Sequence, residues 1–288
     1  MIAVIGTGYW GSKIVSTVKN MKLPVETYDI NDNLEKIKSN NVIIATPANT
    51  HKEITKKMLL QKKNVLVEKP AFMSMKECNE IGKIIKSKFM SGHILLYSEH
   101  FQYILEHLSF FNHSIQHVEC RRLNWGRVQK DISPVLHLSP HDIAVLDILM
   151  QQIPISVNCK PFYITDSVQP DYVTVDLNYN DIDIQIQTGW YYNEKIRNIK
   201  IFTDKGIFDW KDDQNSTNFF ANGNDKDNES FSEYQSSLQN QIQAFIDYCE
   251  KDIEPVSNFA HTKRVTYIVE CIEQSLKTNE EIKCSKKY

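Results

Sequence analysis

The chain has 288 residues, of which 41% are hydrophobic and 24% charged, and its formal net charge is −3. These values are typical of a globular protein of about two domains. They provide no basic face for nucleic acid, and no apolar run reaches the roughly 20 residues that span a bilayer. The N-terminus is already a predicted strand and leaves no room for a signal peptide. Six scattered cysteines without a C-x-x-C motif favour reduced thiols in the cytoplasm.

The first predicted strand, residues 2–5, leads directly into Gly6-Thr7-Gly8-Tyr9-Trp10-Gly11 and a helix over 9–20. This is the G-x-G-x-x-G fingerprint in its dinucleotide-binding context, with a strand before it and a helix after it. Gly6 is expected to make a tight turn, Gly8 to let the backbone approach a pyrophosphate, and Gly11 to let the helix pack on the strand. The sequence therefore predicts that residues 6–11 hold a dinucleotide at the positive end of the helix.

Strand and helix patterns alternate over the first hundred residues. The predicted strands are 2–5, 24–29, 42–45, 64–67 and 93–97, and the predicted helices are 9–20, 32–38, 50–62, 74–88 and 99–111. Ser74 and Glu77 form a capping-box pattern at one helix start. This alternation predicts an α/β domain with a Rossmann-type, doubly wound parallel sheet over residues 1–112.

Beyond residue 112 the predicted strands follow one another mostly without helices. They lie near 115–123, 155–164, 171–178, 182–190, 198–203 and 206–210, with helices near 140–151, 232–250 and 259–277. The alternation of apolar residues from 171 to 187 favours a sheet with one buried face, and the polar stretch 211–230 predicts a loop. Residues 113–288 are therefore expected to form an α+β domain with a large, mostly antiparallel sheet, used for substrate binding and oligomerisation.

Asp29 ends the second predicted strand. An acidic residue at this point of a β-α-β unit accepts hydrogen bonds from the adenosine ribose and repels a 2′-phosphate, which favours NAD over NADP. The alternative is that Asp29 only caps a turn.

The third and fourth strands end at the same expected crevice. Residues Ala45, Thr46, Pro47 and His51 follow the third strand, and Glu68 and Lys69 follow the fourth. All six are predicted to contact the cofactor because the carboxyl ends of parallel strands face it. For the stretch near His51 the alternative is a capped helix start. A partly buried lysine at the crevice is also suited to proton transfer.

Ser139-Pro140-His141-Asp142 predicts a helix start, with Ser139 as N-cap and Asp142 completing a capping box. The helix dipole would lower the pKa of His141 and Asp142 would raise it, so the sequence leaves the net direction open. The alternative is an exposed histidine in a capping turn. His137 precedes the predicted cap and shares no helical face with His141, and no third ligand has suitable spacing, so no metal site is predicted.

Basic and aromatic residues near the end of a sheet strand, Trp190, Lys195 and Arg197, are candidates for holding a charged substrate group, and Arg127 is assigned with them. The alternative for this stretch is a solvated hairpin edge.

Taken together, these motifs resemble the Gfo/Idh/MocA family of nicotinamide-dependent oxidoreductases over nearly the whole chain. The matching stretches are GTGYWG, Asp29, IIATPANTHKE, VEKPAFMSMKE, LSPHDIAVLDIL, GWYYNEKIRNIKIFTDKG and PVSNFAHTKRVTYIVECIEQSL. The resemblance implies that Lys69 is the catalytic lysine and that His141 exchanges a proton. It also implies a Lys69–Pro70 bond that is often cis. L-x-P-H-D-I together with W-x4-K-x-R is similar to sugar and nucleotide-sugar dehydrogenases, including UDP-N-acetylglucosamine(uronate) 3-dehydrogenases.

The chain departs from the family pattern at one position. The family usually has Asp four residues before the proton-exchanging histidine, where this chain has His137. His137 is therefore a candidate for the catalytic site and for substrate binding. Either His137 substitutes in substrate binding, or the enzyme uses a different substrate set, or its activity is reduced. Three rival functions also stay open: a non-catalytic NAD-binding regulator or assembly protein, which the departure favours, an NAD-dependent glycosidase, and a metal hydrolase that uses the histidines. The expected partners are a small sugar or nucleotide sugar and a second copy of the chain, in a homodimer or homotetramer formed through a sheet face that needs burial. Neither nucleic acid nor a membrane is expected.

Overall fold

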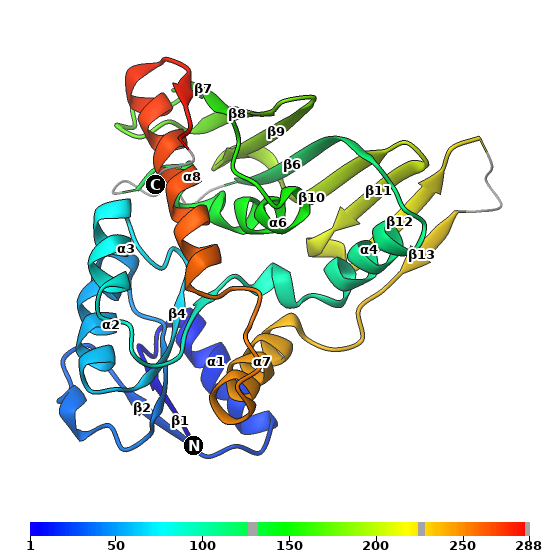
Figure 1. Ribbon diagram of the computed structural model, residues 1–288. Coiled ribbons are helices and arrows are strands. Elements are labelled where there is room, and N and C mark those ends of the chain that lie inside the picture. Colours follow the sequence, from blue (N-terminus) through cyan, green and yellow to red (C-terminus); the bar gives the residue numbers. More distant parts are fainter. Residues whose placement is uncertain (126–131, 224–227, 286–288) are drawn as a thin grey trace. The chain divides into compact units, whose positions relative to one another are not determined.

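The computed structural model describes residues 1–125, 132–223 and 228–285. The chain divides into two compact units, and each unit is built from two segments (Figure 1). Unit 1 contains Met1–Tyr97 and Gln235–Thr266, and unit 2 contains Ser98–Tyr234 and Tyr267–Tyr288. The sequence predicted a single boundary at residue 112. In the structure the helix that starts at Glu99 belongs to unit 2, and residues 235–266 return to unit 1.

Unit 1 is the predicted doubly wound sheet. Its five parallel strands have the order β2-β1-β3-β4-β5. In chain order the elements are β1 Ile2–Ile5, α1 Tyr9–Asn20, β2 Val25–Tyr28, η1 Leu34–Lys36, β3 Asn41–Ile44, η2 Ala48–Thr50, α2 His51–Leu60, β4 Asn64–Glu68, α3 Met75–Gly82, β5 Phe89–Gly92, η3 Ile94–Tyr97, α7 Ser237–Lys251 and the start of α8 Phe259–Thr278. β1, β3 and β4 are buried apolar runs, as expected for strands covered on both faces.

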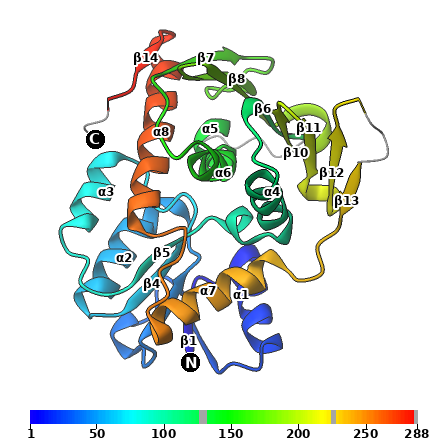
Figure 2. The same ribbon diagram turned by 45° about the vertical axis from the view of Figure 1, so that its right-hand side comes forward.

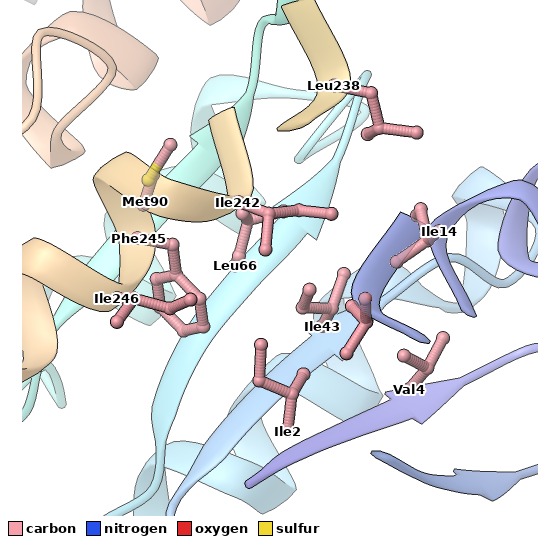
Figure 3. Close-up of a cluster of buried hydrophobic side chains, with 11 residues drawn as sticks. Ile2, Val4, Ile14, Ile43, Leu66, Met90, Leu238, Ile242, Phe245 and Ile246 are labelled. Carbon is pink, nitrogen blue, oxygen red and sulfur yellow. The ribbon is translucent and has the colours of Figure 1, made fainter. Parts of the chain in front are cut away.

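Helix α7 completes the core of unit 1 although it lies far along the chain. Figure 3 shows Leu238, Ile242, Phe245 and Ile246 of this helix meeting apolar side chains of the sheet and α1. Phe245 and Ile242 are fully buried in this cluster. The apolar face of α7 thus packs on the sheet formed by the first hundred residues.

Unit 2 contains a large, mostly antiparallel sheet with covering helices (Figure 2). The described strands have the order β13-β12-β11-β10-β6-β9-β8-β7-β14, and only β6 and β9 among them pair in parallel. The elements are α4 Glu99–Phe110, β6 Ile115–Trp125, α5 Pro134–Leu138, α6 Pro140–Met150, β7 Ser156–Phe162, β8 Tyr172–Tyr179, β9 Ile182–Gly189, β10 Tyr191–Thr203, β11 Gly206–Lys211, η4 Asp212–Gln214, β12 Ser216–Ala221, β13 Glu229–Phe231, the end of α8, and β14 Ile282–Lys283.

The two faces of this sheet differ in chemistry. One row of paired residues is apolar and buried, and it runs Val175, Ile186, Cys120, Ile199, Trp210. The neighbouring row points to the opposite face and is polar, and it runs Asp176, Gln185, Glu119, Lys200, Asp209. The face opposite the buried row is therefore polar along this row.

The predictions for residues 93–97 and 211–230 were wrong. The fifth strand is Phe89–Gly92, and residues 94–97 form a short 3₁₀ helix instead of the predicted strand. The apolar run ILLY was misleading because pairing with β4 selects the preceding, less strand-like segment FMSG. The predicted loop 211–230 contains β12 and β13, and in β12 the buried Thr217 and Phe219 lie on either side of the partly accessible Asn218.

Candidate functional site

The glycine fingerprint folds as a turn between β1 and α1. Gly6 has a φ of +93°, and a β-carbon on Gly11 would lie 1.9 Å from the Gly6 carbonyl oxygen. These two positions therefore require glycine for the packing of the chain itself. A β-carbon on Gly8, in contrast, would meet nothing within 4 Å. The protein leaves open space at Gly8, which fits the approach of a pyrophosphate to this backbone.

The start of α1 is suited to an anion. Its N-cap is Gly8, without a side-chain cap, and its first turn holds no acidic residue. Thr7, Gly8 and Tyr9 are exposed, and the Thr7 carbonyl accepts a hydrogen bond from Ser12 Oγ at 2.8 Å. The positive end of the helix is thus uncompensated by carboxylates on the chain, which is the arrangement that phosphate groups use.

Asp29 lies at the same edge of the sheet, directly after β2. Its backbone N–H bonds to Asp32 Oδ2 at 2.6 Å, and its own Oδ1 accepts the Ile30 N–H at 2.8 Å. The turn therefore fixes the carboxylate of Asp29 while the residue stays exposed. A fixed, exposed carboxylate at the end of β2 can accept hydrogen bonds from ribose hydroxyls.

His51 connects the segments that follow β3 and β4. Its ring is buried, with Nδ1 2.8 Å from the Pro70 carbonyl oxygen and Nε2 2.8 Å from the Thr46 carbonyl oxygen. Both nitrogens are thus directed at protein carbonyls, so the ring orders these two segments. Burial lowers the pKa of His51, although both carbonyl contacts favour the proton. Thr46 also shares a 2.7 Å hydroxyl contact with Thr50. Thr50 precedes α2 and gives it no side-chain cap, unlike the capped helix start that was the alternative for this stretch.

Glu68 is a buried carboxyl group at the end of β4. It is 7% exposed, and a β-carbon on Gly92 would lie 2.9 Å from its carboxyl carbon. Burial raises the pKa of Glu68, while the Trp10 indole, the Lys69 ammonium and the Gln241 amide favour its charged form. Trp10 Nε1, Glu68 Oε1 and Gln241 Oε1 nonetheless lack a hydrogen bond of normal geometry within the described residues. These orphaned polar atoms, close to the glycine turn, fit a site that a polar ligand completes.

Lys69 follows Glu68 and is partly buried, and the Lys69–Pro70 peptide bond is cis. His93 directly follows β5, its ring is buried, and it lies close enough to Lys69 for the two charges to interact. Burial, together with the charges of His261 and Lys69, lowers the pKa of His93 well below its usual value. His93 therefore stays neutral beside Lys69 at neutral pH, and its ring packs edge-on against His261 at 5.2 Å between centroids.

In unit 2, Asp142 does not complete the predicted capping box. Its fully buried carboxylate instead accepts three contacts of 2.8–3.0 Å from the Arg122 guanidinium of β6. Burial opposes the charge of Arg122, but Asp142 outweighs it and raises the pKa of Arg122. The bidentate pair anchors α6 to the sheet, and Ser139 gives no side-chain cap.

His137 and His141 lie closer than the sequence indicated. Helices α5 and α6 are separated only by Ser139, whose φ of −66° and ψ of −21° are helical. The two histidines therefore have i,i+4 spacing along nearly continuous helix, so the expectation that they share no face was wrong. The His137 ring lies 5.4 Å from the ring of the buried Trp190, which joins these two predicted residues.

The predicted basic residues occupy different surroundings. Arg197 donates to the carbonyls of Leu123 and Ile196 and to Asn124 Oδ1, and burial lowers its pKa to about 10. Lys195 is exposed in a bulge of β10. Both residues line an open surface hollow of about 250 Å³. Its other charged lining residues are of both signs: Arg121, Lys200, Lys211, Glu194, Asp209 and Asp213. Arg127 lies outside the described residues.

Within the described ranges, no three histidine, cysteine, aspartate or glutamate side chains come together as metal ligands would. Over those same ranges, none of the helices is both long and apolar enough to cross a membrane.

Sequence comparison finds a family match within unit 1. Residues 22–91 match the Gfo/Idh/MocA model, described as an oxidoreductase family with an NAD-binding Rossmann fold. This part of unit 1 is similar to that family, and unit 1 has a Rossmann-type parallel sheet. An uncharacterized oxidoreductase of Streptococcus pneumoniae serotype 4 is 32% identical over 115 residues, and the match spans 32% of this chain and 31% of that protein's length.

Solved structures share the fold of the whole chain. UDP-N-acetylglucosamine 3-dehydrogenase from Acidithiobacillus ferrooxidans has a TM-score of 0.81 and 18% identity over 95% of this chain and 96% of its own. An NAD-binding protein from Listeria innocua has a TM-score of 0.79 and 21% identity over 98% of this chain and 96% of its own. At these identities the similarity shows the fold alone, which is the expected Rossmann sheet joined to a mostly antiparallel sheet.

The two glycines that differ in their packing give a matched test. Gly8→Ala should leave the free energy of unfolding nearly unchanged and weaken NAD binding about tenfold or more, because only the ligand needs that space. Gly11→Ala should lower the free energy of unfolding by about 1–3 kcal/mol or more through overpacking. Denaturant unfolding and NAD titration measure both. Equal effects of the two variants on NAD affinity, with no difference in stability, would contradict this reading of the turn.

His93 should make stability depend on pH. The unfolded chain binds a proton at His93 near pH 6.5, above the folded pKa, so the unfolded state holds more protons and stability decreases as pH falls below about 6.5. His93→Gln should remove up to about 1.4 kcal/mol per pH unit from that slope. Denaturant unfolding between pH 7.5 and pH 5 measures this slope, and His117→Gln, at a partly accessible histidine of β6, is the control. An unchanged slope in His93→Gln would refute the assignment.

Proposed function

We propose that the protein is an NAD-dependent oxidoreductase that transfers a hydride between nicotinamide and a carbinol or keto carbon of a sugar or nucleotide sugar. The observation that carries this proposal is the convergence of groups at one edge of unit 1. The glycine turn, Asp29, Thr46 and Lys69 all follow the carboxyl ends of parallel strands. An anion site, a ribose acceptor and a partly buried lysine therefore share the edge where this fold binds its dinucleotide.

The preference for NAD over NADP rests on Asp29. Its exposed carboxylate can accept hydrogen bonds from the adenosine ribose and would repel a 2′-phosphate. Residues 6–11 would hold the pyrophosphate, and Ala45, Thr46 and Pro47 follow β3 toward the same edge. His51 contributes by ordering the Thr46 and Pro70 carbonyls, since both of its ring nitrogens are already directed at them.

In the oxidising direction the substrate C–H bond breaks and its O–H proton must leave. A nicotinamide held at this edge would supply the hydride acceptor, and Lys69 or His141 would take the proton. In the reducing direction the same group protonates the carbonyl oxygen. Such positioned acid–base groups contribute about 10²–10⁴-fold to the rate. The neutral His93 beside Lys69 adds no competing positive charge.

The sugar class is supported by the motifs around His141 and Trp190 and by the fold shared with the Acidithiobacillus ferrooxidans enzyme, which is named a UDP-N-acetylglucosamine 3-dehydrogenase. His137 and Trp190 would contact the sugar, since their rings lie together. Arg127, Lys195 and Arg197 would hold a negatively charged substrate group. The half-buried Arg197 guanidinium is positioned by its bonds to the Leu123 carbonyl and Asn124 Oδ1, and its positive charge would attract such a group.

A non-catalytic NAD-binding protein is the second candidate, because His137 stands where the family usually has Asp. Assembly as a homodimer or homotetramer and location in the cytoplasm are further parts of the proposal. The oligomer rests on the family resemblance alone.

A panel of free and nucleotide sugars with NAD and NADH tests the function. We expect at least one nucleotide sugar to be oxidised or its keto form reduced, with a mass change of two hydrogens and matching absorbance at the NADH band. Release of a leaving group without net NADH would indicate a glycosidase instead. NAD binding without turnover of any sugar would favour the non-catalytic candidate.

A substitution of Lys69 tests its role in proton exchange. Lys69→Met should lower kcat by at least about 100-fold while NAD still binds, because the variant loses the proton-exchanging group and keeps the glycine turn. The exposed Lys76→Met, in the first turn of α3, is the matched control and should keep wild-type turnover. Wild-type kcat in Lys69→Met would remove Lys69 from the catalytic step.

A further inference from the structure

Two of the six cysteines are brought together in unit 2. Cys271 lies in α8, and Cys284 directly follows β14. Cys271 is buried, whereas Cys284 is partly accessible, and both are free thiols. Neither thiol has a part in the proposed nicotinamide chemistry.

Three backbone contacts hold the segment around Cys284 in place. β14 pairs with β7 at Ile282 and Lys283. The Cys284 N–H donates to the Ile155 carbonyl oxygen at 2.7 Å, and the Ser285 N–H donates to Tyr267 Oη at 2.7 Å. Tyr267 precedes Cys271 by one helical turn, so the two side chains share a face of α8. The chain after β14 is thus fixed against the turn of α8 that presents Cys271.

The thiols themselves interact. The Cys284 S–H and the Tyr267 O–H donate to Cys271 Sγ, and these bonds lower the pKa of Cys271 even though burial and Glu270 oppose the thiolate. At two other cysteines burial is the dominant effect, and it raises the pKa of Cys159 and of Cys249 to about 12. A stabilised thiolate beside a second thiol is the arrangement that oxidises readily to a disulfide.

We propose that Cys271 and Cys284 form a reversible disulfide, and that this pair is an oxidation site for peroxides. One thiol attacks a peroxide oxygen, the O–O bond breaks, and a sulfenic acid and water form. The second thiol then displaces the sulfenic oxygen as water, so two thiols and hydrogen peroxide yield one disulfide and two waters. Both sulfurs are oxidised and the peroxide is reduced.

The disulfide would close a loop over residues 271–284 and tie the edge strand β14 to α8. β14 has two residues and lies at the end of the sheet, and such an edge opens easily while it is held by few bonds. Oxidation would convert this edge into a covalently fastened one, and reduction would release it.

Peptide mapping of the folded protein after hydrogen peroxide treatment tests the site. We expect a cross-linked peptide containing Cys271 and Cys284, the loss of two free thiols, slower amide exchange at Ile282 and Lys283, and full reversal by a phosphine reductant. Cys284→Ser should abolish the cross-link. The matched control Cys249→Ser, at a partly accessible cysteine of unit 1, should retain it.

The outcome that overturns the proposal is defined independently of any sugar or NAD assay. It is refuted if peroxide oxidises Cys249 while Cys271 and Cys284 stay uncross-linked, or if cross-links distribute among other cysteine pairs. Failure of the substrate panel leaves this thiol result unaffected, and the converse also holds.

Discussion

The approach of α1 to β1 leaves no space for a side chain, and the cofactor edge of unit 1 depends on that contact. Gly11 meets the Gly6 carbonyl where a β-carbon would lie at 1.9 Å. The helix can therefore begin directly at the end of the strand, and its positive end lies at the same sheet edge as Asp29 and Lys69. At Gly8, in contrast, the protein leaves the space beside the α-carbon empty.

Polar groups in both units are buried in ways that order the neighbouring functional residues. In unit 1 the His51 ring ties the Thr46 carbonyl to the Pro70 carbonyl, directly after Lys69. In unit 2 the Arg122–Asp142 pair fixes the first turn of α6, directly after His141. Buried ion pairs contribute little net stability, but they restrict geometry because leaving one partner alone is costly. The residues beside the candidate catalytic groups are thus held in place by buried polar contacts.

The sequence was informative where one local pattern determines one structure. The glycine fingerprint, the buried strands of unit 1 and the box at Ser74 followed from spacing, and Ser74 does accept the Glu77 N–H. Patterns that depend on distant partners were misread. Asp142 was assigned to a cap although Arg122, from another element, takes its carboxylate. The strand β5 was displaced because β4 selects its partner. The environment of Glu68 includes Gln241 from α7, which no local spacing in the first hundred residues indicates.

The contribution of α7 to unit 1 affects the order in which the chain acquires structure during synthesis. The core around Ile43 and Leu66 is closed by Ile242 and Phe245, which the ribosome delivers after nearly all of unit 2. One apolar face of the sheet of unit 1 therefore stays uncovered by α7 while the ribosome synthesises unit 2. The nascent chain exposes that apolar surface to chaperones for most of its translation. A premature stop before α7 would leave the glycine fingerprint in a domain whose sheet lacks one of its covering helices.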